Sequence, residues 1–156
     1  MMGDEGVGVR VIRRLLEDYI LPPGVDAVDG GTGGLSLLPL IRESGRVILV
    51  DALDAGAKPG SIFLLEAADI EETPRLRLSL HDTGILDVLR SASLLDGRAP
   101  ATVIGIQPAR MDEFGGELSE IVENRMEDVL GMILEMLAAE GLEPHPRGNC
   151  SPLWKR

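Results

Sequence analysis

The strongest constraint on the fold is an unbroken apolar run, Val47-Ile48-Leu49-Val50. A strand with one face in water alternates between apolar and polar residues, whereas a continuous run is typical of a strand buried on both faces of a parallel sheet. The sequence therefore predicts a buried strand over 46–52. Such a strand needs helices on both sides, which favours a layered α/β domain.

The rest of the chain alternates between helical and strand patterns. Apolar residues recur at helical spacing and are predicted to share one face, namely Val7, Val11, Leu15 and Tyr19 with Ile12 and Leu16. Two prolines follow them. In order, the sequence predicts a helix over 7–19, a strand over 25–28, a helix over 35–43, strands over 46–52 and 61–66, a polar loop over 69–77, a helix over 84–95, a strand over 101–106 and a helix over 119–140, capped by Ser119 and ended by Gly141. Residues 1–141 are predicted to form one domain, and 142–156 a loosely held tail.

The charge balance excludes several classes of partner. The chain has 26 acidic and 15 basic residues, a net charge of -11. Nucleic acid and anionic membrane surfaces would repel it, and no apolar run is long enough to span a bilayer. No secretory signal pattern is present, and Cys150 is the single cysteine. A cytoplasmic location without disulfides is therefore expected.

Three loops at expected carboxyl ends of strands carry metal-binding side chains. They offer Glu5 with its neighbour Asp4, then Asp51, then His81. Two carboxylates and an imidazole suit a divalent metal. Each residue also has a plain structural interpretation. The two acids complement a helix N-terminus, Asp51 bonds loop amides, and His81 is a surface residue or a cap.

Two further features carry weaker signals. The run Asp29-Gly30-Gly31-Thr32-Gly33-Gly34 resembles a phosphate cradle but lacks the lysine of a P-loop, which favours a tight turn close to a ligand. His145 and Cys150 lie in the proline-rich tail, where exposed positions are expected.

Taken together, the loops resemble those of a known family. The motifs occur in the order Gly3-Asp4-Glu5-Gly6-Val7-Gly8-Val9-Arg10, Asp29-Gly30-Gly31-Thr32, Val50-Asp51-Ala52 with Asp54, Ser79-Leu80-His81 and Gly105-Ile106-Gln107-Pro108. This order resembles the hydrogenase maturation proteases, from about Gly3 to Gly141. The resemblance implies a cytoplasmic three-layer α/β/α sandwich with a twisted, mostly parallel sheet.

The resemblance also implies a function. It identifies a metal-dependent endopeptidase that removes a C-terminal extension from the nickel-loaded [NiFe] hydrogenase large-subunit precursor. Glu5, Asp51 and His81 carry over as metal ligands and catalytic residues, and the loop Asp29, Gly30, Gly31 and Thr32 as the substrate side. The nickel is expected to arrive with the substrate, and zinc or cadmium to substitute for it. Whether the metal polarises the scissile carbonyl, activates a water or serves recognition stays open.

One departure from the family concerns the start of the chain. Family members begin with a short apolar strand ending in Gly-Asn, which the sequence lacks before Gly3. The resemblance therefore implies a sheet without its first strand and neighbouring edges without partners. Either the start is assigned too far downstream or a partner chain fills the gap.

Two other functions compete with the peptidase. A non-catalytic assembly factor would dock on the metallated precursor without cleaving it. A small α/β binding domain would use the acidic loops only as caps.

Overall fold

The computed structural model describes residues 3–31, 34–66, 77–78, 100–109 and 116–148. Its elements are η1 (Gly3–Gly6), α1 (Val7–Asp18), β1 (Tyr19–Ile20), η2 (Gly34–Leu37), α2 (Leu38–Glu43), β2 (Val47–Asp54), β3 (Ile62–Glu66), β4 (Arg77–Leu78), β5 (Ala101–Ile106), α5 (Glu120–Glu123), α6 (Met126–Ala139) and β6 (His145–Pro146). The predicted helix over 84–95 and most of the predicted loop over 69–77 lie outside the described residues.

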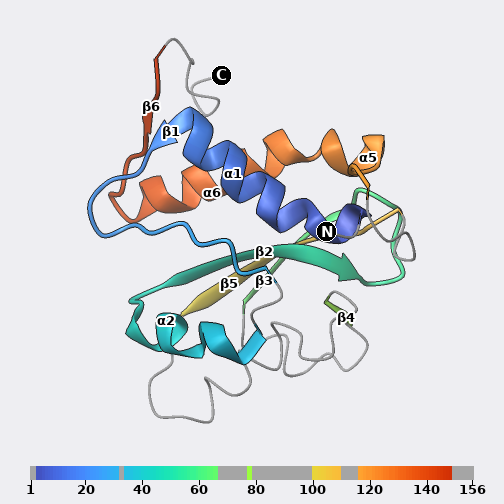
Figure 1. Ribbon diagram of the computed structural model, residues 1–156, viewed down its shortest axis with the longest axis horizontal. Helices are drawn as coiled ribbons and strands as arrows, with labels where there is room; N and C mark the ends of the chain where they lie inside the picture. The colour runs from blue at the N-terminus through green and yellow to red at the C-terminus, as the bar shows by residue number, and fades with distance from the viewer. Residues whose placement is uncertain (1–2, 32–33, 67–76, 79–99, 110–115, 149–156) are drawn as a thin grey trace.

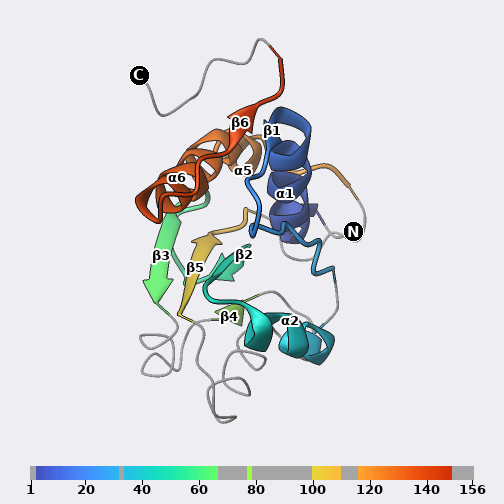
Figure 2. The same cartoon turned by 90° about the vertical axis from the view of Figure 1, so that its left-hand side faces the viewer.

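A sheet with the strand order β3-β5-β2-β4 forms the middle layer. α1 and α6 lie over one of its faces and α2 over the other (Figures 1 and 2). This confirms the predicted α/β sandwich. The sheet is more mixed than predicted, because among the described strands only β2 and β5 pair in parallel, while β3 and β4 run antiparallel to their neighbours.

The predicted face of the first helix is confirmed except at Leu16, which is 41% exposed. Val7, Val11 and Leu15 are buried on α1, and Tyr19 is buried at the point where β1 begins. They join one apolar cluster with the buried residues of α6 and with Ile104 of β5. Burying this stripe, more than helix propensity, fixes α1 on the sheet.

The predicted helix over 119–140 is interrupted. Ser119 caps its start as expected, since its hydroxyl accepts a hydrogen bond from the Val122 amide. α5 then ends, Asn124 and Arg125 form a turn, and α6 continues to Ala139. Gly141 follows with a φ of +76°, a conformation that glycine adopts without strain, and this ends the helix where predicted.

The predicted strand over 25–28 is wrong. Residues 25–30 have no regular secondary structure, and no described strand pairs with them. A strand needs a neighbour to complete its backbone hydrogen bonds. The predicted helix over 35–43 divides into η2 and α2, and Pro39 occupies the first turn of α2, where a missing amide proton costs nothing.

The beginning of the predicted tail is held in place. β6 pairs with β1, with Tyr19 opposite Pro146 and Ile20 opposite His145. The Arg147 backbone amide donates to the Asp18 carbonyl at 2.7 Å, and its side-chain Nε donates to the Tyr19 carbonyl at 3.1 Å. Residues 145–147 are therefore not loose, although the His145 side chain is exposed as expected. Cys150 lies outside the described residues.

Candidate functional site

The η1 turn lies at the carboxyl end of β2 because α1 packs directly on that strand. A Cβ atom built on Gly8 would lie 2.2 Å from the Val50 carbonyl oxygen and 3.9 Å from the Asp51 Cα atom. Only a residue without a side chain allows this approach. Glycine at position 8 therefore sets the turn that carries Glu5 against the strand that carries Asp51.

Asp4 anchors this turn to the neighbouring part of the sheet. Its side chain is 1% exposed. One carboxylate oxygen accepts from the Ser119 amide at 2.6 Å, and the other accepts from the Ala109 amide at 2.8 Å and the Ser119 hydroxyl at 2.9 Å. Asp4 thus joins η1 to the segment after β5 and to the start of α5. Of the two adjacent acids, this one has an architectural role.

Glu5 and Asp51 line the same cavity. It has a volume of about 840 Å³, and its wall also includes Asp29, Gly30 and Gly31. Asp51 lies in the second half of β2, where its Oδ1 accepts from the Ala52 amide at 2.8 Å. The plain interpretation of Asp51 as a partner for backbone amides therefore holds for one oxygen. Both predicted carboxylates nevertheless reach one wall, at the sheet edge where α/β proteins place their sites.

The third predicted ligand, His81, lies outside the described residues. The chain approaches it through β4, in which Leu78 pairs with Leu53 and Arg77 with Asp54. Leu78 is therefore held at the carboxyl end of β2, close beyond Asp51. Within the described ranges, no group of three or more histidine, cysteine, aspartate or glutamate side chains is placed to hold a metal ion. The complete ligand set stays a prediction.

The glycine-rich loop forms a tight turn, the interpretation favoured by its sequence. The Gly31 amide donates to Asp29 Oδ1 at 3.0 Å, and Gly31 has a φ of +48°. Arg13 of α1 lies 3.9 Å from the other Asp29 oxygen, in an exposed ion pair. Asp29, Gly30 and Gly31 meet the cavity as expected for a ligand-side loop, while Thr32 lies outside the described residues.

Gln107 has a structural role that sequence reasoning missed. It follows β5 directly, and its side-chain oxygen accepts from the Ala55 amide at 2.9 Å and the Ala57 amide at 3.1 Å. Its amide nitrogen donates to Asp54 at 3.2 Å. The buried Gln107 thus fixes the loop that follows β2. The signal was available, because a long polar residue directly after a buried strand needs partners at the sheet edge.

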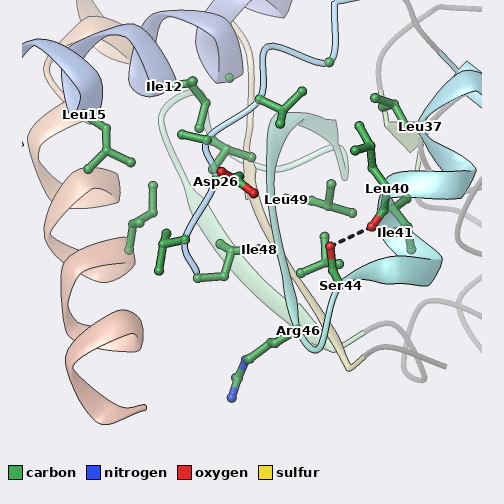
Figure 3. Close-up of a pocket in the computed structure, with 18 of the residues that line it drawn as sticks. Ile12, Leu15, Asp26, Leu37, Leu40, Ile41, Ser44, Arg46, Ile48 and Leu49 are labelled. Carbon is green, nitrogen blue, oxygen red and sulfur yellow. Dashed lines mark hydrogen bonds between the residues drawn. The ribbon is translucent and has the colours of Figure 1, made fainter. Parts of the chain in front are cut away.

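Apolar side chains form most of the remaining cavity wall. Figure 3 shows Ile12 and Leu15 of α1 on one side and Leu40 and Ile41 of α2 on the other, with the β2 edge between them. Leu137 of α6 adds to the first side. The cavity therefore combines a long apolar section with a polar end at Glu5 and Asp51.

Comparison with known proteins decides the family. The model of the hydrogenase maturation protease family matches residues 9–136, most of the chain. This chain belongs to the hydrogenase maturation protease family. The membership supports a protease role in hydrogenase maturation, and it confirms the resemblance given by the loop motifs.

Individual relatives agree with this assignment. The hydrogenase expression/formation protein HupM of Azotobacter chroococcum is 39% identical over 94% of this chain and 71% of its own length. The hydrogenase 2 maturation protease of Escherichia coli is 33% identical over 94% of this chain and 90% of its own. Among solved structures, the hydrogenase maturating endopeptidase HybD of Escherichia coli superposes with a TM-score of 0.84 at 29% identity, covering 96% of this chain and 93% of the other.

More distant solved structures keep the same fold. The [NiFe] hydrogenase maturation protease HybD of Thermococcus kodakarensis superposes with a TM-score of 0.69 at 26% identity, covering 87% of this chain and 91% of its own. No helix in the described ranges is both long enough and apolar enough to span a membrane.

Proposed function

We propose that this chain is the endopeptidase that removes a C-terminal extension from the nickel-loaded large-subunit precursor of a [NiFe] hydrogenase. The observation that carries the proposal is the convergence of Glu5 and Asp51 on one cavity wall at the carboxyl end of β2. Two family members, from Escherichia coli and Thermococcus kodakarensis, are named as proteins that mature hydrogenases.

The donor set fits a metal that the substrate delivers. Nickel in the precursor is held by thiolates, so its recognition requires ligands that contact a vacant coordination position without removing the ion. Carboxylates and an imidazole are weaker competitors for nickel than thiolates. Glu5 and Asp51 offer oxygens from the cavity wall, and His81 is assigned the imidazole. Held by these residues, the ion would supply Lewis acidity or a point of recognition for the precursor.

A cleavage assay tests the peptidase. The purified chain is mixed with nickel-loaded precursor, and the shortened product is measured by mass. We expect His81→Ala to abolish cleavage while the circular dichroism spectrum and Tm stay unchanged. His145→Ala is the matched control, because His145 is the second histidine of the chain, is exposed, and lies in β6 away from the cavity lining. Cleavage by a folded His81→Ala variant would show that His81 has no essential role in the reaction.

Metal titration separates the two adjacent acids. We expect Glu5→Gln to weaken nickel, zinc or cadmium binding at least tenfold more than Asp4→Asn, because Asp4 is occupied by Ser119 and Ala109. The readout is the shift in Tm on adding each ion, at temperatures where both variants are folded. Equal losses of metal affinity in the two variants would mean that Glu5 is the wrong choice of metal ligand from this pair. Precursor binding without cleavage by the wild-type chain would favour the assembly factor. An unchanged Tm with every ion would favour the plain α/β binding domain.

A further inference from the structure

The end of β5 and the residues directly after it contact both elements that carry a predicted carboxylate ligand. In the parallel pairing of β5 with β2, Gly105 lies opposite Asp51. Slightly further along the chain, the Ala109 amide donates at 2.8 Å to Asp4, the residue before Glu5 in the η1 turn. This short stretch of backbone therefore joins the strand of Asp51 to the turn of Glu5.

The side chain of Gln107, in the middle of this stretch, continues the connection between β5 and β2. The regular pairing of the two strands ends at Ala52 and Ile106, and Gln107 is the next residue of the chain. Its side chain is 6% exposed. The amide nitrogen donates to the Asp54 carboxylate at 3.2 Å, and the oxygen accepts from two backbone amides of the loop that follows β2. One buried side chain thus extends the connection between the strands beyond their last backbone pair.

The backbone of Gln107 holds the other edge of β5. Its amide donates to the Ser61 carbonyl, and its carbonyl accepts from the Gly60 amide, both at 2.9 Å. Gly60 is buried against α5, since a Cβ atom built on it would lie 2.7 Å from Ile121 Cγ2. Each of these hydrogen bonds keeps its donor and acceptor about 3 Å apart. The carboxyl end of β2 therefore cannot shift along β5 unless the contacts of Gln107 break.

We propose that Gln107 is a positioning residue for the two carboxylates, Glu5 and Asp51. Its side chain fixes the carboxyl end of β2, which carries Asp51. The same stretch of chain fixes the η1 turn through the contact of Ala109 with Asp4. The separation of the two carboxylates is thereby set from β5. Groups that orient metal ligands without touching the ion change metal affinity about 10–100-fold when they are substituted. This inference rests on the proposed role of both carboxylates as metal ligands.

Two buried polar residues on the β5 side provide a matched pair of variants. Gln107→Met keeps the length of the side chain and removes its hydrogen bonds to Asp54 and to the loop after β2. Thr102→Val is the control. Thr102 is 1% exposed, lies near the start of β5 and outside the cavity lining, and its hydroxyl donates to Glu66.

Amide hydrogen exchange measures the positioning without any metal. Exchange at Ala55 and Ala57, whose amides donate to the Gln107 side chain, should accelerate by about tenfold in Gln107→Met. It should stay unchanged in Thr102→Val. Unchanged exchange in Gln107→Met would overturn the proposal, because other contacts would then hold the loop.

Cadmium alone is the probe of the ligand geometry. Calorimetric titration is carried out at a temperature where every variant is folded, so that a loss of stability does not affect the result. We expect Gln107→Met to raise the Kd for cadmium by about tenfold, and Thr102→Val to change it by less than about twofold. The kcat/KM for cleavage of the nickel-loaded precursor should fall in parallel. Faster exchange with an unchanged Kd would limit Gln107 to a structural role and overturn the proposal.

A second variant carries the same test if Gln107→Met does not fold. Gln107→Asn keeps the neutral amide but is one methylene shorter, so it cannot reach Asp54 and the loop amides together. A folded Gln107→Asn variant with the wild-type Kd for cadmium would also overturn the proposal. A wild-type chain that neither binds cadmium nor cleaves the precursor would overturn the proposed function, and the positioning role with it. A wild-type chain active in both assays, beside an unaffected Gln107 variant, would overturn the positioning role alone.

Discussion

β2 and β5 are neighbouring strands with similar apolar sequences, yet their surroundings differ. Every residue of β5 is buried, since β2 and β3 pair with it on both sides. In β2 the residues Val47–Val50 are only half-buried, although helices cover both faces of the sheet. Among the described residues, β2 pairs along its length only with β5, and β4 reaches only Leu53 and Asp54 on its other edge. An apolar run thus specifies which faces of a strand are covered, and the edges are completed by pairing.

The largest expected effect measures this difference directly. Ile104 of β5 is 0% exposed, and the half-buried Ile48 of β2 packs against the same apolar cluster. Truncating a buried isoleucine costs 2–5 kcal/mol, with lower values where the site is already solvated. We expect Ile104→Ala to lower the free energy of unfolding by about 4 kcal/mol and Ile48→Ala by about 2 kcal/mol, measured by urea denaturation. Equal losses would mean that the β2 edge is covered in solution.

The next largest loss of stability is expected where α1 packs on the second half of β2, at Gly8. Gly8→Ala would place a methyl group against the Val50 carbonyl, and α1 would have to move away from the strand. Overpacking of this kind costs about 3 kcal/mol, and the same shift should reduce metal binding at Glu5. Gly131→Ala is the matched control, because Gly131 lies inside α6 and an added Cβ atom there would have no neighbouring side chain or other element within 4 Å. There the substitution should stabilise by about 0.5–1 kcal/mol. A neutral Gly8→Ala variant would contradict the close contact.

Part of this fold could be predicted from the sequence. The apolar faces of α1 and β2 follow from periodicity alone, and they gave the layers of the fold. The strand expected over 25–28 failed because strand formation depends on pairing, and no described strand pairs with these residues. The turn at Asn124 and Arg125 also escaped prediction, since neither residue is a strong helix breaker.

The candidate site was predictable to a similar degree. Motif order selected Glu5 and Asp51, and both reach one cavity. Composition and spacing alone could not separate Asp4 from Glu5. The separation depends on Ser119 and Ala109, whose amides meet Asp4 only in the folded chain. Gln107 was quoted as part of a motif, but its partners in the loop after β2 come from the tertiary structure.

Substitution of Asp4 tests the hydrogen bonds that join the η1 turn to Ala109, after β5, and to Ser119, at the start of α5. Asp4→Asn replaces one acceptor oxygen by a donor that faces amide groups, so at least one buried amide loses its partner. We expect a loss of about 2 kcal/mol in the free energy of unfolding, whereas Glu5→Gln should cost less than about 0.5 kcal/mol. Thermal and urea denaturation of both variants provide the comparison. A larger loss for Glu5→Gln would reverse the structural roles of the two acids.

The smallest loss of stability is expected at Thr102, near the start of β5, which is 1% exposed. Its hydroxyl donates to the Glu66 carboxylate at 3.0 Å. Thr102→Val keeps the shape of the side chain and removes this hydrogen bond, while the exposed Glu66 regains water as a partner. The loss should therefore stay below about 1 kcal/mol. Because β5 is paired with a strand on both edges, the Thr102–Glu66 hydrogen bond should add little to its stability. A loss well above this value would show that this polar contact, rather than pairing with β2 and β3, holds β5 in place.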